Sequence, residues 1–370
     1  MEMLIHAQKI KGVLHDLQIS EPKIHADNEK NGRSGHMGHA LTEFAPGKIM
    51  AFSSNTSANR SAGHTGFGWM EYRISEDYGD SWGEPIVFPY SWEALLDGLY
   101  CVAVEKAVTC DNGDIAVFCY VFKQAYEQCC GAFSCPVVVI SKDQGKTWEA
   151  PMAVSNYKGR IYDVLYYKGC IYALQHCHDG ETHFCGNQPE HIYRLLKSED
   201  KGCSFQEICV VPFDDIMGLG YGSMVITPDE RLIVYAYNRY DEENMSCIVS
   251  KDFGKSWGKT QKSFVKNRIR NPQVGVLDGQ YILHGRAGDN EKGDRGAFVF
   301  YTSKDGLIWD DGVILVKNRH ACFYSDNLTV TMPSGKQRMI VKYSENYHIG
   351  RKNDTWGQVN SMMLTLETVK

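Results

Sequence analysis

A tyrosine and a glutamate in the last quarter of the chain have the side chains of a nucleophile pair. Tyr324 opens one run of apolar and hydroxyl residues, and Glu345 closes the next run. A phenolic oxygen becomes a usable nucleophile when a nearby carboxylate takes its proton. We therefore predict that Tyr324 and Glu345 are catalytic, and that Asp326, in the same stretch as the tyrosine, binds substrate.

A histidine in a long polar stretch is the candidate for proton transfer. His64 lies in Ser53–Gly68, which is rich in Ser, Thr, Asn and Gly and is long enough to reach over a central site. The ordinary pKa of histidine lies close to neutrality, which suits a group that gives and takes protons. We predict a catalytic role for His64, and the alternative is a solvated loop histidine.

Four further histidines are candidates for substrate or metal binding. His36 and His39 precede an apolar run, and two residues three apart point to opposite faces of a regular strand, so a shared metal would need a bulge. His176 and His178 belong to the polar cluster Gln175–His183. No spacing among them fixes a coordination set, so we expect no metal and predict that His36, His176 and His178 contact substrate.

Three arginines occupy successive connections in the second half of the chain. Arg239 follows an apolar run, and Arg286 and Arg295 flank 287–294. A guanidinium offers paired donors in one plane, which makes arginine a natural clamp for a carboxylate. We predict that these arginines and Arg33, near the start of the chain, bind an anionic substrate.

An internal repeat, S-x-D-x-G-x-[ST]-W, indicates the scaffold that positions these side chains. Asp and Ser can accept hydrogen bonds from backbone N–H groups, Gly can take a positive φ, and Trp can pack as an apolar plug. We assign the repeat to stability. Its copies recur roughly every 50 to 70 residues, the period of one four-stranded propeller blade. They span 75–82, 141–148, 198–205 (with Phe for Trp), 250–257 and the shorter 303–309.

Six pairs of apolar runs, each joined by a turn marked by Gly or Pro, predict six blades, five of which carry the repeat between their third and fourth strands. We expect an all-β, six-bladed β-propeller that forms one domain over 1–370. The sixth blade ends in 361–366, so an N-terminal segment within 4–19 should supply its fourth strand and close the ring. The turns and repeats share one end, so the site should lie at the other. The six turns are 45–47, 111–114, 168–169, 228–230, 278–279 and 333–335.

Composition agrees with a turn-rich all-β protein. The 370 residues include 35 Gly and 12% aromatic residues, and the formal net charge of −6 gives no basic excess that would indicate nucleic acid. No apolar run approaches the length of a membrane span. Thirteen cysteines without a signal-like N-terminus favour a reducing cytoplasm, with secretion after signal removal as the alternative. We expect a carbohydrate substrate and no cofactor, and homo-oligomerisation is left open.

The five repeats, the six-blade rhythm and Tyr324-Ser325-Asp326 at the start of blade six resemble the sialidase (neuraminidase) superfamily of Asp-box propellers. The resemblance covers nearly the whole chain at the level of the repeat. It implies a Tyr nucleophile, which Tyr324 matches, and a three-arginine carboxylate clamp, which Arg239 and Arg295 match. The residues that align with the family's first clamp arginine are His36-Met37-Gly38 in this chain, and Arg33 lies a few positions earlier.

Two further positions differ from the family. Its acid/base aspartate falls by spacing on His64, and the glutamate that opens its fourth blade falls near Tyr221. The leading hypothesis is a diverged sialidase-like exo-glycosidase that hydrolyses a glycosidic bond of an anionic, sialic-acid-like sugar. The alternatives are a polysaccharide lyase that acts on uronates through His and Tyr, and a non-catalytic glycan-binding propeller.

Overall fold

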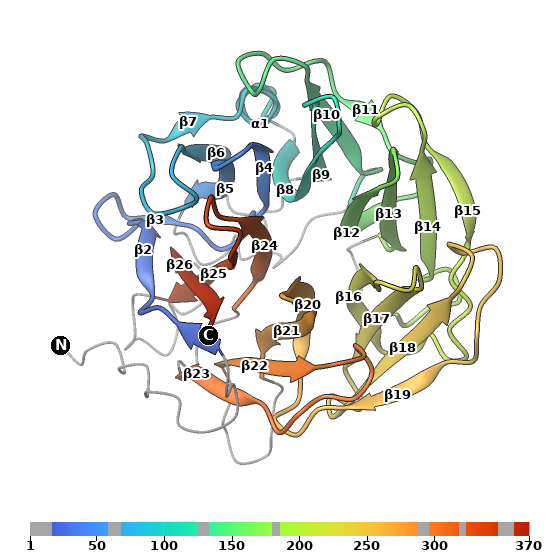
Figure 1. Ribbon diagram of the computed structural model, residues 1–370. Helices are drawn as coiled ribbons and strands as arrows, with labels where there is room; N and C mark the ends of the chain where they lie inside the picture. The colour runs from blue at the N-terminus through green and yellow to red at the C-terminus, as the bar shows by residue number, and fades with distance from the viewer. Residues whose placement is uncertain are drawn as a thin grey trace.

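Six antiparallel β-sheets surround a common axis in the computed structural model (Figure 1). It describes residues 17–57, 68–98, 100–123, 133–179, 186–287, 296–317, 323–346 and 359–369. The predicted all-β, six-bladed propeller is confirmed. In these ranges α1 (Pro89–Leu96), between the first and second sheets, is the only helix, and none is long and apolar enough to cross a membrane.

Sheets two to five each consist of four strands that follow one another in sequence. Sheet two contains β8 (Tyr100–Thr109), β9 (Ile115–Lys123), β10 (Val137–Ser141) and β11 (Met152–Ala153). Sheet three contains β12 (Gly159–Tyr167), β13 (Cys170–Cys177), β14 (Tyr193–Ser198) and β15 (Gln206–Val210). Sheet four contains β16 (Leu219–Ile226), β17 (Leu232–Asn238), β18 (Asn244–Ser250) and β19 (Gln261–Phe264). Sheet five contains β20 (Arg270–Leu277), β21 (Gln280–Arg286), β22 (Ala297–Ser303) and β23 (Val313–Lys317).

Sheets one and six each have five strands. Sheet one contains β3 (Arg33–Ser34), β4 (Leu41–Ala45), β5 (Lys48–Ser57), β6 (Gly68–Ser75) and β7 (Ile86–Val87). Sheet six contains β24 (Ser325–Thr331), β25 (Gln337–Asn346) and β26 (Val359–Thr368), together with β1 (Leu17–Ile19) and β2 (Lys23–Ala26). Both β1 and β2 pair with β26, with Leu17 opposite Thr368, so the N-terminal part of the chain supplies the outer edge of the last blade.

The apolar core lies between neighbouring blades. All residues of β17 are buried, as are all but the last of β9, because a second strand is covered on both faces by adjacent sheets. Outer strands such as β15 are largely exposed. The apolar clusters each join two or three consecutive blades, and one joins blade six to blade one. Each fully buried Val, Ile, Leu or Phe contributes roughly 1.5–3 kcal/mol, so the ring is stabilised at every junction.

The repeated turns lie between the third and fourth strands of five blades, and the second copy shows their chemistry. Ser141 Oγ accepts a hydrogen bond from Gly145 N (2.7 Å), and the Asp143 carboxylate accepts bonds from Thr147 Oγ1 (2.6 Å) and N (2.8 Å). The bonds from Thr147 lower the pKa of Asp143 to about 2. Gly145 takes a φ of +83°, and Trp148 packs against the core of blades one and two. The turn is a structural device, as its residue types predict.

The innermost strands meet at one buried lysine on the axis. The Nζ atom of Lys106, on β8, lies 3.3 Å from Asp163 of β12, is hydrogen-bonded to Asp326 of β24, and donates to Gln273 of β20 (2.5 Å). Burial alone would lower the pKa of Lys106, but the two carboxylates more than offset it, so its pKa lies above the ordinary value. A buried cation of this kind is stable only because it is paired.

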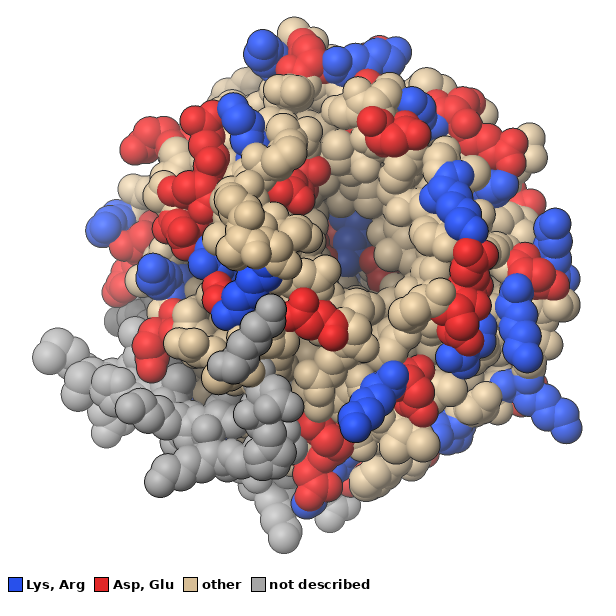
Figure 2. All heavy atoms as spheres, viewed as in Figure 1, with Lys and Arg blue, Asp and Glu red and all other residues tan. Residues whose placement is uncertain are grey.

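The remaining two blades join the same network through the carboxylates. Asp163 Oδ2 accepts hydrogen bonds from Ser223 Oγ and Met224 N of β16, both 2.7 Å, and Asp326 Oδ2 accepts one from Leu41 N of β4 (3.0 Å). We call Lys106, Asp163, Asp326, Gln273 and Ser223 the Lys106 network. It closes one end of an axial channel of about 460 Å³. Figure 2 shows the central hollow of the ring with charged atoms at its base.

Candidate active site

A small polar cavity lies on the axis, on the opposite side of the Lys106 network from the channel. It opens toward the end of the ring where the long connections between strands lie. It encloses about 40 Å³, room for a few water molecules, so a sugar ring would lie across its opening. Its lining residues come from the beginnings and middles of the innermost strands and from the segment between β3 and β4. They are 37–39, 104–106, Arg160, Tyr162, Tyr221, Asn271, Gln273, Tyr324 and Ser325.

Tyr324 immediately precedes β24 and is fixed from both sides. Its N–H donates to Ser344 Oγ (3.0 Å), and its carbonyl accepts from Ser344 N (2.9 Å). The preceding residue, Phe323, is fully buried, stacks on Phe298 with ring centroids 5.4 Å apart, and takes a φ of +45°. Such a φ is costly for an aromatic residue and persists only where packing enforces it. The buried Phe323 ring thus sets the direction in which Tyr324 leaves the core.

The hydroxyl of Tyr324 is held in a hydrogen-bonded chain that crosses the axis. It lies 3.1 Å from the hydroxyl of Tyr221, which accepts a hydrogen bond from Arg160 Nη1 (3.2 Å). The other edge of the guanidinium binds Glu105, with Nε–Oε1 and Nη2–Oε2 distances of 2.5 and 3.0 Å. Four blades therefore contribute one residue each to a chain from Glu105 to Tyr324.

Arg160 is buried among aromatic rings at the start of β12. Its guanidinium carbon lies 4.4 Å from the ring centroid of Tyr120 and 5.2 Å from those of Tyr162 and Tyr221. Burial would lower the pKa of Arg160, but Glu105 outweighs it and the pKa is raised. Burial raises the pKa of Glu105, against the opposing effect of Arg160. The fork with Glu105 and the three rings fix the guanidinium in one orientation.

His36 lies against the candidate nucleophile. Its ring meets the Tyr324 ring edge to face, with centroids 5.1 Å apart. The segment 35–40 leaves the sheet between β3 and β4, which both pair with β5. Within it, His39 Nε2 lies 3.1 Å from the His36 carbonyl oxygen, and buried Lys342 Nζ lies 3.3 Å from His39 Nδ1. Burial and Lys342 hold the pKa of His39 well below its ordinary value, so a neutral His39 positions His36.

Two residues predicted to act with Tyr324 contact further groups. The Glu345 carboxylate lies 3.5 Å from the hydroxyl of Tyr343 on the same strand, and it is buried. Asp326 belongs to the Lys106 network and lines the channel, where Lys106 and Leu41 N occupy its two oxygens. The Tyr324 hydroxyl is within hydrogen-bonding distance of that of Tyr221, which lies near the position where the family resemblance implies a glutamate.

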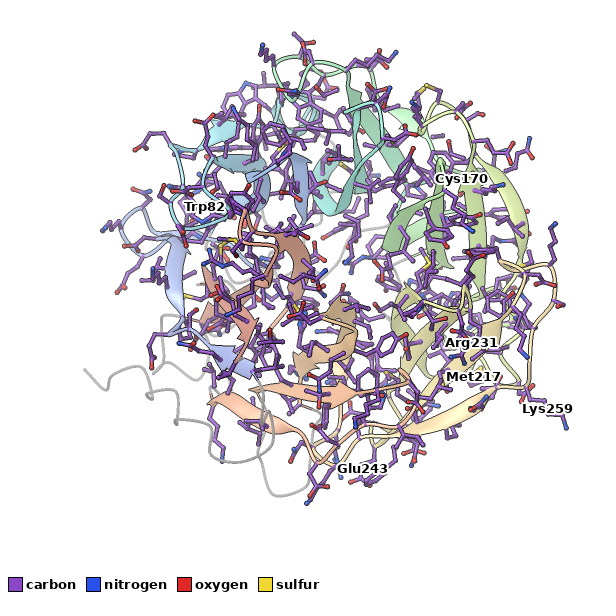
Figure 3. The ribbon with its side chains drawn as sticks, viewed as in Figure 1. Trp82, Cys170, Met217, Arg231, Glu243 and Lys259 are labelled. Atoms are coloured by element: carbon purple, nitrogen blue, oxygen red, sulfur yellow. The ribbon has the colours of Figure 1, made fainter. Side chains whose placement is uncertain are left out.

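The predicted arginines are distributed over two regions. Arg33 donates from Nε and Nη2 to Asn55, both at 2.7 Å, and lies over the Trp69 ring. Arg239 lines a separate polar pocket of about 290 Å³ between blades four and five. Arg286 ends β21 directly opposite Arg270 of β20, which lines the same pocket. Another residue of this pocket, Glu243, lies toward the outside of the ring in Figure 3.

His176 and His178 are buried in blade three, and their rings lie at a tilt against aromatic neighbours. The ring centroids of His176 and Tyr193 are 4.6 Å apart, and those of His178 and His191 are 4.4 Å apart. Burial, followed by the two other histidines, holds the pKa of His176 well below its ordinary value. Across the described ranges, no group of three or more His, Cys, Asp or Glu side chains is arranged to hold a metal ion. His64 and Arg295 lie outside the described residues.

Sequence reasoning missed the pair of Arg160 and Glu105, although a signal for Arg160 was present. Arg160 follows Gly159 at the start of the first strand of blade three, just as Tyr324 stands at the start of the first strand of blade six. A long polar side chain at such a position can reach the axis, as Arg160 does. Glu105 had no comparable signal, because it stands in the middle of an otherwise apolar strand where Val104 and Lys106 are separated in register by a bulge.

No protein-family model and no curated protein sequence matches the chain. A solved structure of a protein of unknown function from Dyadobacter fermentans is similar at a TM-score of 0.72 and 15% identity, over 95% of this chain and 99% of that one. A mutant NanB sialidase from Streptococcus pneumoniae is similar at a TM-score of 0.64 and 10% identity, over 92% of this chain and 69% of that one. Trypanosoma rangeli sialidase in complex with 2,3-difluorosialic acid, described as a covalent intermediate, is similar at a TM-score of 0.60 and 12% identity. The match covers 94% of this chain and 58% of that one. The chain therefore has the fold of a diverged sialidase-like propeller.

Proposed function

We propose that the chain is a sialidase-like glycoside hydrolase in which Tyr324 attacks the anomeric carbon of an anionic sugar. The position of Tyr324 carries the proposal. Tyr324 lines the axial cavity, its hydroxyl lies 3.1 Å from the Tyr221 hydroxyl, and the residue is partly exposed. A nucleophile must reach both its activating groups and the substrate, and this position meets both requirements.

The reaction follows the double displacement of retaining glycosidases with tyrosine in place of a carboxylate. The phenolic proton passes to water at the opening of the cavity, and an electron pair of the phenolic oxygen forms a bond to the anomeric carbon. The bond from that carbon to the leaving oxygen breaks, its electron pair stays on the oxygen, and an acid protonates it. Water then attacks the glycosyl-tyrosine and returns a proton to Tyr324. His64 remains our candidate for the acid.

The anionic character of the sugar stays a proposal from the sequence, and two of the predicted arginines lie between blades four and five, in a region separate from the axial cavity. Arg270 and Arg286 stand directly opposite each other on paired strands, where like charges repel. Glu242 lies 3.0 Å from Arg270 and offsets part of this repulsion. Arg239 reaches the same pocket as Arg270 from blade four. Glu243, 3.3 Å from Arg268, lines this pocket as well, so guanidinium groups here are already paired with carboxylates, and the turnover panel decides between an anionic and a neutral sugar.

The test is turnover of a panel of aryl and natural glycosides that differ in the charge of the sugar, with product analysis. We expect hydrolysis of an anionic aryl glycoside, and a lower KM for it than for a neutral glycoside of the same leaving group. Arg286→Met should raise the KM for the anionic substrate several-fold, and Arg338→Met, in an ion pair with Asp80 and Glu367 at the turn end, is the matched control.

Two results would contradict the proposal. An unsaturated product that absorbs in the near ultraviolet would identify a lyase, because elimination leaves a double bond in the sugar. Binding of glycans without any turnover across the panel would identify a binding propeller.

A further inference from the structure

We infer that Arg160, acting through Tyr221, stabilises the ionised form of Tyr324 and so helps to activate this nucleophile. The inference rests on the proposed function for its catalytic meaning. The linkage itself consists of two hydrogen bonds, 3.2 Å from Arg160 Nη1 to Tyr221 Oη and 3.1 Å from there to Tyr324 Oη.

The direction of the chain follows from the chemistry of its members. A guanidinium can only donate, so the Tyr221 oxygen accepts from Arg160. An oxygen that accepts from a cation makes its own O–H a better donor, because the charge polarises the hydroxyl. When Tyr324 loses its proton, the Tyr221 hydroxyl is placed to donate to the phenolate. A hydrogen bond to the charged form of a group lowers its pKa.

The charge of Arg160 is directed toward Tyr221 although Glu105 neutralises it overall. Glu105 binds the edge formed by Nε and Nη2, and Tyr221 binds Nη1 on the opposite edge. The positive end of this ion pair thus faces the tyrosines. Arg160 is 3% exposed, and in such surroundings a fixed dipole acts more strongly than in water.

Other ionisable groups lie around the cavity, and they do not all favour the ionised form of Tyr324. Lys106 is paired with Asp163 and Asp326 inside its own network. His39 is buried and bonded to the His36 carbonyl, and the His36 ring lies across the Tyr324 ring. Burial holds the pKa of Tyr162 well above its ordinary value, so Tyr162 stays neutral. Among the described residues, Glu105 and the two carboxylates of the Lys106 network lie close to the cavity and oppose ionisation of Tyr324, and Arg160 stands between Glu105 and the tyrosines.

The balance of the step is simple. Tyr324 gives its proton to water at the opening of the cavity, where its side chain is partly exposed, and the resulting phenolate is the nucleophile of the first displacement. Arg160 and Tyr221 keep their protons throughout. They are positioning residues, and Tyr324 is the catalytic residue.

The test is a pH titration of tyrosinate absorbance in the near ultraviolet, in which the curve of Tyr324→Phe is subtracted from that of the wild type. We expect the difference to show one tyrosine that ionises below the ordinary value of about 10. Tyr221→Phe should raise this apparent pKa by about one unit or more, since it removes the donor to the phenolate. Glu105→Gln should lower it, because the guanidinium charge is then no longer neutralised.

Opposite shifts from two neighbouring substitutions separate an electrostatic role from a merely structural one. Tyr162→Phe is the matched control, because it removes a hydroxyl beside Arg160 without interrupting the chain, and it should leave the titration unchanged. An unshifted Tyr324 in the wild type, or equal titrations in all variants, would overturn the inference.

The two proposals fail in different ways. Glycoside hydrolysis that is lost in Tyr324→Phe, together with a flat titration, would leave the proposed function in place and remove this inference. The predicted titration without turnover of any glycoside would leave the Arg160 linkage and remove the proposed function.

Discussion

Two buried cations near the axis of the ring, Lys106 and Arg160, have different surroundings. Lys106 is enclosed by two carboxylates and an amide from three other blades, which are themselves bonded to the remaining blades. Arg160 has one carboxylate, three tyrosine rings and a hydroxyl chain that ends on a partly exposed tyrosine. The first arrangement is closed on itself and connects the ring. The second is open at one end, and that end is where chemistry can occur.

The open end gives the largest expected effect. Tyr324→Phe removes the attacking oxygen and keeps the ring, so turnover should fall by several orders of magnitude, on the scale of about 10⁴–10⁶ seen when covalent nucleophiles are removed. The thermal midpoint should barely change. The measurement is kcat on an activated aryl glycoside, with Tyr343→Phe, a buried tyrosine on the adjacent strand, as control. Near-normal activity of Tyr324→Phe would show that Tyr324 is not the nucleophile, and that the surroundings of Arg160 are no more functional than those of Lys106.

The closed network gives the largest expected effect on stability. Lys106→Met leaves Asp163 and Asp326 buried without their cation, and breaking a buried pair from one side costs about 3–5 kcal/mol of unfolding free energy. Denaturant unfolding measures this cost. Lys142→Met is the control, since Lys142 pairs with Glu149 on the surface at 2.6 Å and such pairs contribute little to stability. Equal stability of the two variants would show that the Lys106 network does not connect the ring.

Tyr221→Phe tests the link between Arg160 and the nucleophile by activity. A hydrogen bond to a charged group contributes about 1.5–3 kcal/mol, so turnover should fall roughly ten- to hundredfold at neutral pH. Raising the pH should recover part of the loss, because Tyr324 then ionises without help. A kcat that falls equally at every pH would point to a packing defect.

The smallest expected effect is the pH dependence of stability around the Lys106 network. Burial, followed by the charge of Lys106, lowers the pKa of His284 to about 3. In the unfolded chain histidine titrates near 6.5, so the unfolded state binds more protons between these values, and stability present above about pH 6.5 is lost as pH falls. His284→Gln should make the decline of Tm between about pH 6 and pH 4 shallower than in the wild type. An unchanged slope would show that His284 takes up no fewer protons than the unfolded chain.

The fold could be predicted from the sequence because its signals are local. The turns that Ser141, Asp143 and Gly145 form depend on residues within a few positions, and their recurrence sets the blade. Apolar runs such as β17 follow from the same logic, since a second strand is covered on both faces. The position of Tyr324 at the start of an innermost strand also follows from the blade pattern alone.

The contacts of the site could not be predicted in the same way. Arg160 meets Glu105 and Tyr221 across sequence separations of 55 and 61 residues, and Tyr221 meets Tyr324 across 103. Which side chains meet depends on how far each strand extends toward the axis. Arg33 shows the converse. Its place in the sequence predicts a substrate contact, yet in the structure two of its nitrogen atoms donate hydrogen bonds to Asn55.

The most direct test of the account is to trap the covalent intermediate. The chain is incubated with a fluorinated, activated donor of an anionic sugar, whose glycosyl-enzyme forms faster than it is hydrolysed, and is then digested and examined by mass spectrometry. We predict one glycosyl group per chain, attached to Tyr324, and none in Tyr324→Phe. Turnover of the parent glycoside with no adduct, or with an adduct on a different residue, would contradict the account.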